Sequence, residues 1–119
     1  MVEDAKLSPL KIYFAAPSCV PATEFETNGG VFDSEKVAEW LPQCCALGEM
    51  MNYVGAINND PEIKRKIQAA QKLGKPIDGH APQLSGESLR KYVAAGISTD
   101  HECSTEQEAL EKITLGMAI

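Results

Sequence analysis

The feature that most constrains the fold is a unit that occurs four times along the 119 residues. Each unit contains a short apolar run, a polar tip, a helix-start signal and an amphipathic stretch that a Gly or Pro closes. Strand and helix signals that alternate in this way are typical of parallel strands joined by helical crossovers. We therefore predict an α/β fold with a parallel sheet, formed by a single domain over residues 1–119.

Local signals predict where the individual elements lie. The first strand is expected at residues 12–16, because their aromatic and β-branched side chains suit a strand that is buried on both faces. The predicted helix starts are polar caps that precede an apolar stripe: Ser34, Asp60 with Pro61, Ser85, and Ser104 with Gln107 as a capping box.

Two of these helices have apolar stripes that predict their buried faces. After Asp60 the stripe consists of Ile63, Ile67, Ala70 and Leu73. The charged residues beside it, Lys66 among them, are expected to face water. After Ser104 the stripe consists of Ala109, Leu110 and Ile113.

The charge balance argues against a nucleic-acid-binding function. Lys and Arg number 11 and Asp and Glu number 17, so the net charge is −6, and the aromatic residues are only three Phe, three Tyr and one Trp. Binding to nucleic acid needs a basic field and aromatic platforms, although a free base or nucleoside remains compatible as a substrate. No apolar run approaches the ~18–20 residues of a membrane span, and no secretory leader pattern opens the sequence. We expect a cytoplasmic protein with no membrane partner.

The cysteines point to reduced thiols. They are Cys19, Cys44, Cys45 and Cys103. No pair has the C-x₂-C spacing of a structural zinc site, and disulfides are rare in the cytosol. We therefore expect thiols in the core or near a site, and no disulfide framework.

Three residues stand at equivalent places in successive units: Glu49, His80 and His101. Each follows an apolar run, and the steps from 49 to 80 and from 80 to 101 each match about one βα unit. The carboxyl ends of parallel strands share one edge of the sheet, and carboxylate and imidazole are ligands for divalent transition metals. The sequence predicts that these residues bind a divalent metal ion. The alternative is a solvated loop acid and two histidines with ordinary surface or core roles.

Acidic residues next to these tips could orient the imidazoles by accepting hydrogen bonds from them. They are Asp78, Asp100 and Glu102, and ordinary loop acids are an equally compatible interpretation. Ser18 and Cys19 lack a nucleophile elbow, and the H-x-E…P-C-x-x-C signature of cytidine deaminases is absent. We predict no catalytic residue apart from the metal ligands, and no organic cofactor site.

Four motifs, in order along the chain, carry a resemblance to a known family. They are P-S-C-V-P-A-T at 17–23, L-G-E-M-M-N at 47–52, D-G-H-A-P at 78–82 and S-T-D-H-E at 98–102. Together they closely resemble the adenine deaminases of the amidohydrolase superfamily, over essentially all 119 residues. One motif alone would be weak evidence, whereas four in sequence are specific.

The resemblance implies a (β/α)₈ barrel that holds two divalent metal ions, manganese or iron, at the carboxyl ends of its strands. In that family the ligands are an H-x-H pair, an acid on the fourth strand, one His on each of the fifth and sixth, and an Asp on the eighth. Glu49 matches the metal-bridging acid, His80 the fifth-strand ligand and His101 the sixth-strand ligand. The implied reaction is hydrolysis of a cyclic amidine C–N bond, which converts adenine to hypoxanthine and ammonia in purine salvage or catabolism.

The sequence departs from the family pattern because it contains no H-x-H motif, and no eighth-strand Asp follows the fourth unit. We therefore expect a partial chain, a parallel half-barrel of roughly strands three to six, that is inactive alone. It is expected to form a homo-oligomer or to require the missing parts of the barrel. Two alternatives stay open: another amidohydrolase, and a non-catalytic half-barrel that serves as a binding or assembly module.

Overall fold

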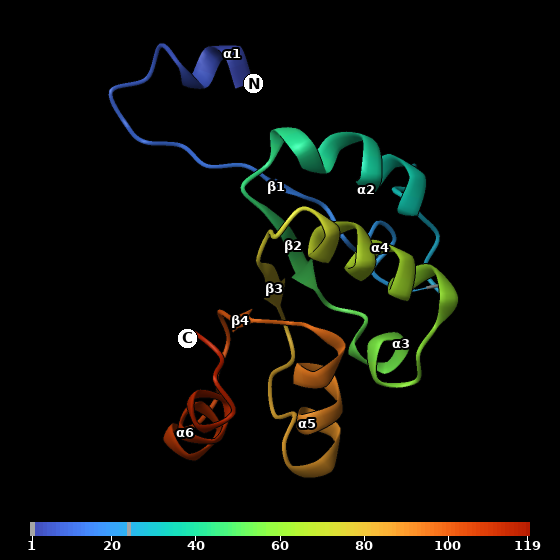
Figure 1. The fold of residues 1–119 in the computed structure, drawn as a ribbon, viewed down its shortest axis with the longest axis vertical. Helices are drawn as coiled ribbons and strands as arrows, with labels where there is room; N and C mark the ends of the chain where they lie inside the picture. The colour runs from blue at the N-terminus through green and yellow to red at the C-terminus, as the bar shows by residue number, and fades with distance from the viewer. Residues whose placement is uncertain (1, 24) are drawn as a thin grey trace.

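A four-stranded parallel sheet, with its strands in chain order β1-β2-β3-β4, forms the centre of the molecule (Figure 1). The computed structural model describes residues 2–23 and 25–119. The strands are β1 (Ala15–Ala16), β2 (Ala46–Met50), β3 (Ile77–Gly79) and β4 (Thr99–Asp100). Each strand pairs in parallel with the next. The predicted α/β class is confirmed, and this arrangement is consistent with part of a (β/α)₈ barrel.

Helices connect each strand to the next, as the repeated unit predicts, and one further helix lies before the first strand and one after the last. The helices are α1 (Val2–Ala5), α2 (Ser34–Trp40), the 3₁₀ turn η1 (Leu41–Gln43), α3 (Tyr53–Ile57), α4 (Pro61–Lys72), α5 (Gly86–Ala95) and α6 (Glu106–Thr114). Figure 1 shows α2 and α4 side by side against the sheet, and α5 and α6 near the C-terminal strands. None of the helices formed by the described residues is long and apolar enough to cross a lipid bilayer.

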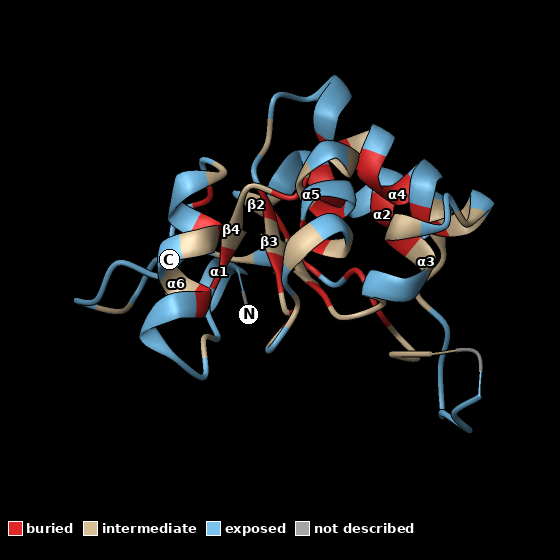
Figure 2. Cartoon of the chain, turned by 90° about the horizontal axis from the view of Figure 1, so that it is seen from below, coloured by how far each residue is buried: buried red, intermediate tan, exposed pale blue. Residues whose placement is uncertain are grey.

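The core lies between the sheet and the helices that cover it. Figure 2 shows the buried residues along the strands and on the helix faces turned toward them. Leu47 and Ile77 from neighbouring strands pack with Ile67 of α4 and with Leu89 and Tyr92 of α5. Both sheet and helices therefore contribute apolar side chains to one continuous core, as in other layered α/β folds.

Helix caps follow the predicted signals closely, with two shifts of one residue. The Asp60 carboxylate accepts hydrogen bonds from the N–H groups of the first turn of α4, and Pro61 begins that helix. Ser85 caps α5 as predicted. The cap of α2 is Asp33 instead of Ser34, and the cap of α6 is Thr105 instead of Ser104. In both cases the residue used also has a side-chain oxygen that reaches the first helical turn.

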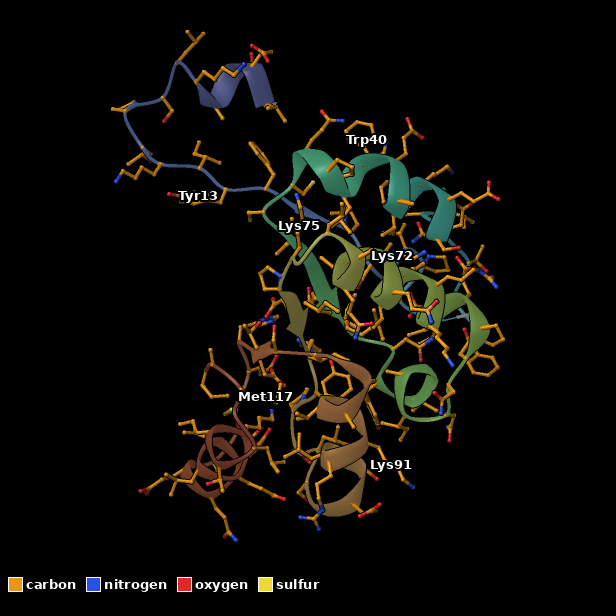
Figure 3. The ribbon with its side chains drawn as sticks, in the orientation of Figure 1. Tyr13, Trp40, Lys72, Lys75, Lys91 and Met117 are labelled. Atoms are coloured by element: carbon orange, nitrogen blue, oxygen red, sulfur yellow. The ribbon has the colours of Figure 1, made fainter. Side chains whose placement is uncertain are left out.

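The first strand is shorter than predicted. Only Ala15 and Ala16 pair with β2, whereas Ile12 and Tyr13 are 46% and 74% exposed. Figure 3 shows Tyr13 on the segment that runs up to β1 from the N-terminus, away from the core helices. Residues 12–14 precede the paired strand, and Ile12 and Tyr13 are exposed there, so the expected burial on two faces is wrong for them.

The predicted buried face of α6 is also wrong. Leu110 and Ile113 are 56% and 54% exposed, whereas Glu108 and Lys112 are buried. In α4, Ile63, Ile67 and Ala70 are buried as predicted, but Leu73 is exposed and Lys66 is buried. Each buried lysine donates hydrogen bonds to backbone carbonyl oxygens, which compensate for its burial. The pattern of apolar residues along a helix does not predict such partners.

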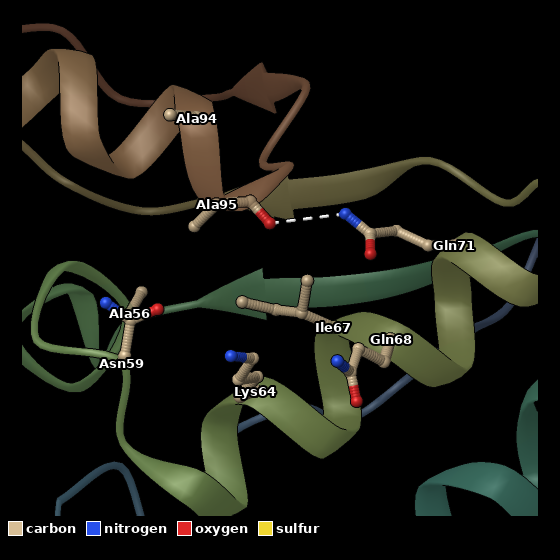
Figure 4. Close-up of a pocket in the computed structure, with 8 residues that line it drawn as sticks. All are labelled: Ala56, Asn59, Lys64, Ile67, Gln68, Gln71, Ala94 and Ala95. Carbon is tan, nitrogen blue, oxygen red and sulfur yellow. Dashed lines mark hydrogen bonds between the residues drawn. The ribbon is translucent and has the colours of Figure 1, made fainter.

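A pocket of about 220 Å³ separates α4 from α5 (Figure 4). Gln71 bridges its rim by donating a hydrogen bond of 3.3 Å to the carbonyl oxygen of Ala95. Among the described residues that line it, none is one of the three predicted metal ligands. We therefore assign this pocket to the packing of the helices and look for the site at the edge of the sheet.

Candidate metal centre

Three neighbouring strands bring the predicted ligands together. Glu49 lies in β2, His80 directly follows β3 and His101 directly follows β4. Because the strands are parallel and adjacent, their carboxyl ends meet at one edge of the sheet. One ligand atom from each of the three residues can be chosen so that all lie within 4.8 Å of one another.

The possible ligand atoms of Glu49, His80 and His101 lie within a few ångströms of one another. Glu49 Oε1 lies 2.9 Å from His80 Nδ1 and 3.5 Å from His101 Nε2. The two imidazoles approach to 3.2 Å between His80 Nδ1 and His101 Nε2, with ring planes inclined by 43°. All three side chains are partly open to solvent, so a small ligand can reach them.

Asp78 fixes the orientation of His101. Its Oδ2 lies 2.9 Å from His101 Nδ1, and Thr99 donates a 2.5 Å hydrogen bond to its other oxygen. With Nδ1 engaged by Asp78, His101 turns Nε2 toward Glu49 and His80. Of the three acids predicted to orient the imidazoles, Asp78 is the one with the clearest contact of this kind.

The electrostatics of His101 favour a positive charge. Burial by itself would lower the pKa of His101, but the hydrogen bond and charge of Asp78, with the charges of Glu49 and Asp100, raise it. The same negative charges would stabilise a divalent cation at this position. One oxygen and two nitrogen donors, with a carboxylate behind one histidine, fit a first-row transition metal.

The other two acids have different positions. Glu102 Oε2 lies 3.4 Å from His80 Nδ1, on the solvent side of the group. Asp100 is buried, and its carboxylate accepts hydrogen bonds from the backbone N–H groups of Ala81 and Glu102. Asp100 therefore acts on the backbone beside the histidines and not on an imidazole nitrogen.

Two further residues, which the sequence argument did not assign to the site, hold its backbone. The Tyr92 hydroxyl donates 2.7 Å to the carbonyl oxygen of Met50 and accepts 3.2 Å from the N–H of His80. The Ser18 hydroxyl donates 2.6 Å to the carbonyl oxygen of Glu49. The feature of the sequence that could have indicated the role of Tyr92 is a tyrosine on the buried face of a helix, because a buried phenol usually has a hydrogen-bond partner.

A groove of about 780 Å³ lies beside the strand that carries Glu49. Residues 18–23 and 51–55 line much of it, and they include most of the motif at 17–23 and the last two residues of the motif at 47–52. Two segments far apart in the sequence therefore form one concave surface at the same edge of the sheet as the ligand group.

Comparison with known proteins identifies the family of this chain. The sequence pattern that defines the amidohydrolase family matches residues 1–118. The chain belongs to the amidohydrolase family. Membership agrees with the fold, because the structure is an α/β chain with a four-stranded parallel sheet.

Several relatives in this family are curated as adenine deaminases. The one from Methanosarcina mazei is 54% identical to the chain over 121 residues, and that from Methanothermobacter thermautotrophicus is 52% identical. The relative from Parabacteroides distasonis is 47% identical. Each match covers 100% of this chain and 22% of the relative. The chain therefore spans about a fifth of the length of the curated relatives it matches.

Proposed function

We propose that this chain supplies three ligands of a divalent metal centre: Glu49, His80 and His101. The observation that carries the proposal is the convergence of one ligand atom from each within 4.8 Å. Support also comes from Asp78, because histidines that bind metal usually contact a carboxylate through their other ring nitrogen. The residues fit the group that the family resemblance implies.

Within this centre each side chain has a separate task. Glu49 would provide the negative charge: its Oε1 lies near both imidazoles, and the family resemblance matches it to the metal-bridging acid. His80 and His101 provide neutral nitrogen donors, and Asp78 holds His101 in the tautomer that presents Nε2. A bound divalent ion supplies Lewis acidity for hydrolysis. We propose manganese or iron and a binuclear centre, whose other ligands come from outside these residues since the sequence has no H-x-H motif.

We propose hydrolytic deamination of adenine to hypoxanthine and ammonia as the reaction to which this segment contributes. The proposal is supported by 47–54% identity to proteins named adenine deaminase over the whole chain. The groove of about 780 Å³ beside Glu49 offers space for a purine-sized substrate at the correct edge of the sheet.

We also propose that residues 1–119 form part of a (β/α)₈ barrel domain, completed by further sequence or by another copy of the chain. The sheet supports this, because β1 is an edge strand and, among the described residues, β4 is followed in the sheet only by a single parallel bridge from Thr99 to Ala118. A cytoplasmic location is supported by the four cysteines, all of which are free thiols.

The decisive experiment replaces the aligned segment of the M. mazei relative with this chain and follows the conversion of adenine by absorbance, together with metal content. The chimera is expected to deaminate adenine. Glu49→Gln in it should lose metal and deamination together, because the carboxylate supplies charge and geometry. Cys44→Ala is the matched control: Cys44 precedes β2 at the opposite edge of the sheet, so activity should stay near that of the parent chimera.

Two results would overturn the proposal. One is a folded chimera that binds metal but does not act on adenine, which would favour a different substrate or a non-catalytic role for this segment. The other is a Glu49→Gln chimera with full metal content and unchanged turnover, which would remove Glu49 from the metal centre.

A further inference from the structure

Beneath the two histidines lies a buried cluster of three charged side chains, which we call the loop brace: Asp100, Glu108 and Lys112. Lys112 is fully buried, Asp100 is 1% exposed and Glu108 is 7% exposed. Lys112 Nζ lies 2.9 Å from Asp100 Oδ2 and 2.8 Å from Glu108 Oε1. Two anions therefore share one cation in the interior, next to the carboxyl ends of β3 and β4.

Each member of the loop brace bonds to the segment after His80. The Asp100 carboxylate accepts a hydrogen bond of 3.2 Å from the N–H of Ala81. Lys112 donates 3.1 Å to the carbonyl oxygen of the same residue. The Glu108 carboxylate accepts 2.8 Å from the N–H of Gln83. The backbone that leaves His80 is thus held at three points.

Each member also bonds to the segment after His101. Asp100 accepts 3.0 Å from the N–H of Glu102, and Lys112 donates 3.0 Å to the carbonyl oxygen of Glu102. Glu108 accepts 2.9 Å from the N–H of Ser104. All three side chains therefore join the same two segments, and those segments begin at the residues next to the two histidines.

Stability alone does not explain a charged cluster at this place. Replacing buried ion pairs by well-packed apolar residues is often neutral or stabilising, so such pairs are retained where they fix one conformation. In α6 the charged residues Glu108 and Lys112 face the interior, whereas the apolar residues Leu110 and Ile113 are exposed, which is the reverse of what burial of apolar surface would favour. A metal centre, in contrast, requires ligands held within about 0.5 Å of their productive positions.

We propose that the loop brace sets the spacing of His80 and His101, and that Lys112 is a positioning residue of the metal centre. The inference rests on the proposed function insofar as it concerns a bound metal. Lys112 touches neither imidazole, and it acts through the backbone of Ala81 and Glu102. Removing its ammonium leaves two buried carboxylates without a cation and frees both segments.

The test uses the 119-residue chain with Lys112→Met and, as the matched control, Lys75→Met. Lys75 also holds backbone carbonyl oxygens, those of Leu41, Pro42 and Cys44, but at the opposite edge of the sheet, as Figure 3 shows. Two quantities are measured for each folded variant. The first is amide hydrogen exchange of Ala81, Gln83, Glu102 and Ser104 without metal, and the second is Co²⁺ affinity with the visible absorption spectrum of the bound ion.

We expect Lys112→Met to lose protection at these four amides, to bind Co²⁺ about 10- to 100-fold more weakly and to alter its spectrum. Lys75→Met should leave the amide protection, the Co²⁺ affinity and the spectrum unchanged. If Lys112→Met does not fold, Glu108→Gln serves as the test variant. Its side chain keeps one acceptor oxygen, but the other oxygen is replaced by an N–H₂ group, which cannot accept from the N–H of Gln83 or Ser104. It should show smaller changes in the same direction.

The outcomes separate the two proposals. A parent chain that binds no Co²⁺ contradicts metal binding by these three ligands alone, and the exchange data then decide whether the loop brace holds both segments. A folded Lys112→Met or Glu108→Gln chain with parental exchange, affinity and spectrum overturns the role of the loop brace and leaves the metal site standing.

Discussion

The phenolic oxygen of Tyr92 accepts a hydrogen bond of 3.2 Å from the backbone N–H of His80. The same hydroxyl donates to the carbonyl oxygen of Met50, so one atom of α5 joins the strands that carry Glu49 and His80. Burial raises the pKa of Tyr92 well above its ordinary value. The raised pKa keeps the hydroxyl protonated, and able to donate, at neutral pH.

Tyr92→Phe should destabilise the chain although it removes a single oxygen atom. Phe fills the same space but leaves the buried carbonyl of Met50 and the partly buried N–H of His80 without the hydroxyl, which costs about 1–3 kcal/mol. Urea unfolding followed by circular dichroism measures the change in unfolding free energy. Tyr53→Phe is the control, because Tyr53 is 37% exposed, and it should lie within about 0.5 kcal/mol of the parent. Equal stabilities of the two variants would contradict the role of the hydroxyl.

Gly79→Ala should disrupt the pairing of β3 with β4. A Cβ atom at Gly79 would lie 2.6 Å from the carbonyl oxygen of Thr99 and 2.8 Å from Ile97 Cγ2, and the first of these is backbone that cannot move aside. Overpacking of this kind typically costs about 1–3 kcal/mol or more. Thermal unfolding should show a clearly lower midpoint than for Gly29→Ala, where an added Cβ meets nothing within 4 Å. A Gly79→Ala protein with the midpoint of the control would show that the strand spacing is different.

Acid should weaken the fold through Glu108. Burial by itself would raise the pKa of Glu108, but hydrogen bonds from Lys112 and from the N–H groups of Ser104 and Gln83 hold it below the ordinary value of 4.5. A lowered pKa in the folded state means that the stabilisation is present above pH 4.5 and is lost as the pH falls through the folded-state pKa. The unfolding free energy should therefore fall with acid in this window.

Urea titrations at a series of pH values measure this effect. Glu108→Gln should be less stable than the parent at neutral pH, and the difference should shrink below pH 4.5 as the carboxylate becomes protonated. Glu87→Gln is the control, since the Glu87 side chain is 73% exposed and should change little at any pH. A constant difference between parent and Glu108→Gln across this range would contradict the assigned charge.

The chain by itself should not deaminate adenine at the rate of a complete relative. It has three of the predicted ligands and no H-x-H motif, so we expect at most one weakly held ion. Its edge strands and exposed Leu10, Ile12 and Tyr13 should also promote self-association. Manganese-loaded chain is assayed with adenine by absorbance, and its mass is measured by size-exclusion chromatography with light scattering. Turnover comparable to a complete relative would contradict this expectation.

The sequence predicts the elements that depend on local chemistry. Asp60 with Pro61 and the left-handed Gly96 after α5 mark helix ends, because capping depends on a few neighbouring residues. The equivalent positions of Glu49, His80 and His101 predicted a shared edge, because the parallel order of strands follows from alternating strand and helix signals. The structure brings these three together, and their metal binding stays a prediction.

What the sequence does not predict depends on partners that are distant along the chain. The burial of Lys112 requires Asp100 at the end of β4 and the backbone of Ala81 in the preceding unit, so no period within α6 can indicate it. Lys66 is buried for the same reason, because it meets the carbonyl oxygens of Ser18 and Phe32. Tyr92 belongs to the stripe of α5, but the role of its hydroxyl appears only when β2 and β3 are side by side.

The chain order of the strands has a consequence for the way the site forms during synthesis. Since β2, β3 and β4 are neighbours in sequence as well as in the sheet, each ligand meets the preceding one by closing a loop of similar length, from 49 to 80 and from 80 to 101. Loop-closure entropy rises only slowly with length, so neither step is much harder than the other. As the polypeptide leaves the ribosome, Glu49 and His80 can meet before His101 has emerged, and the group is completed from the N-terminal side onward.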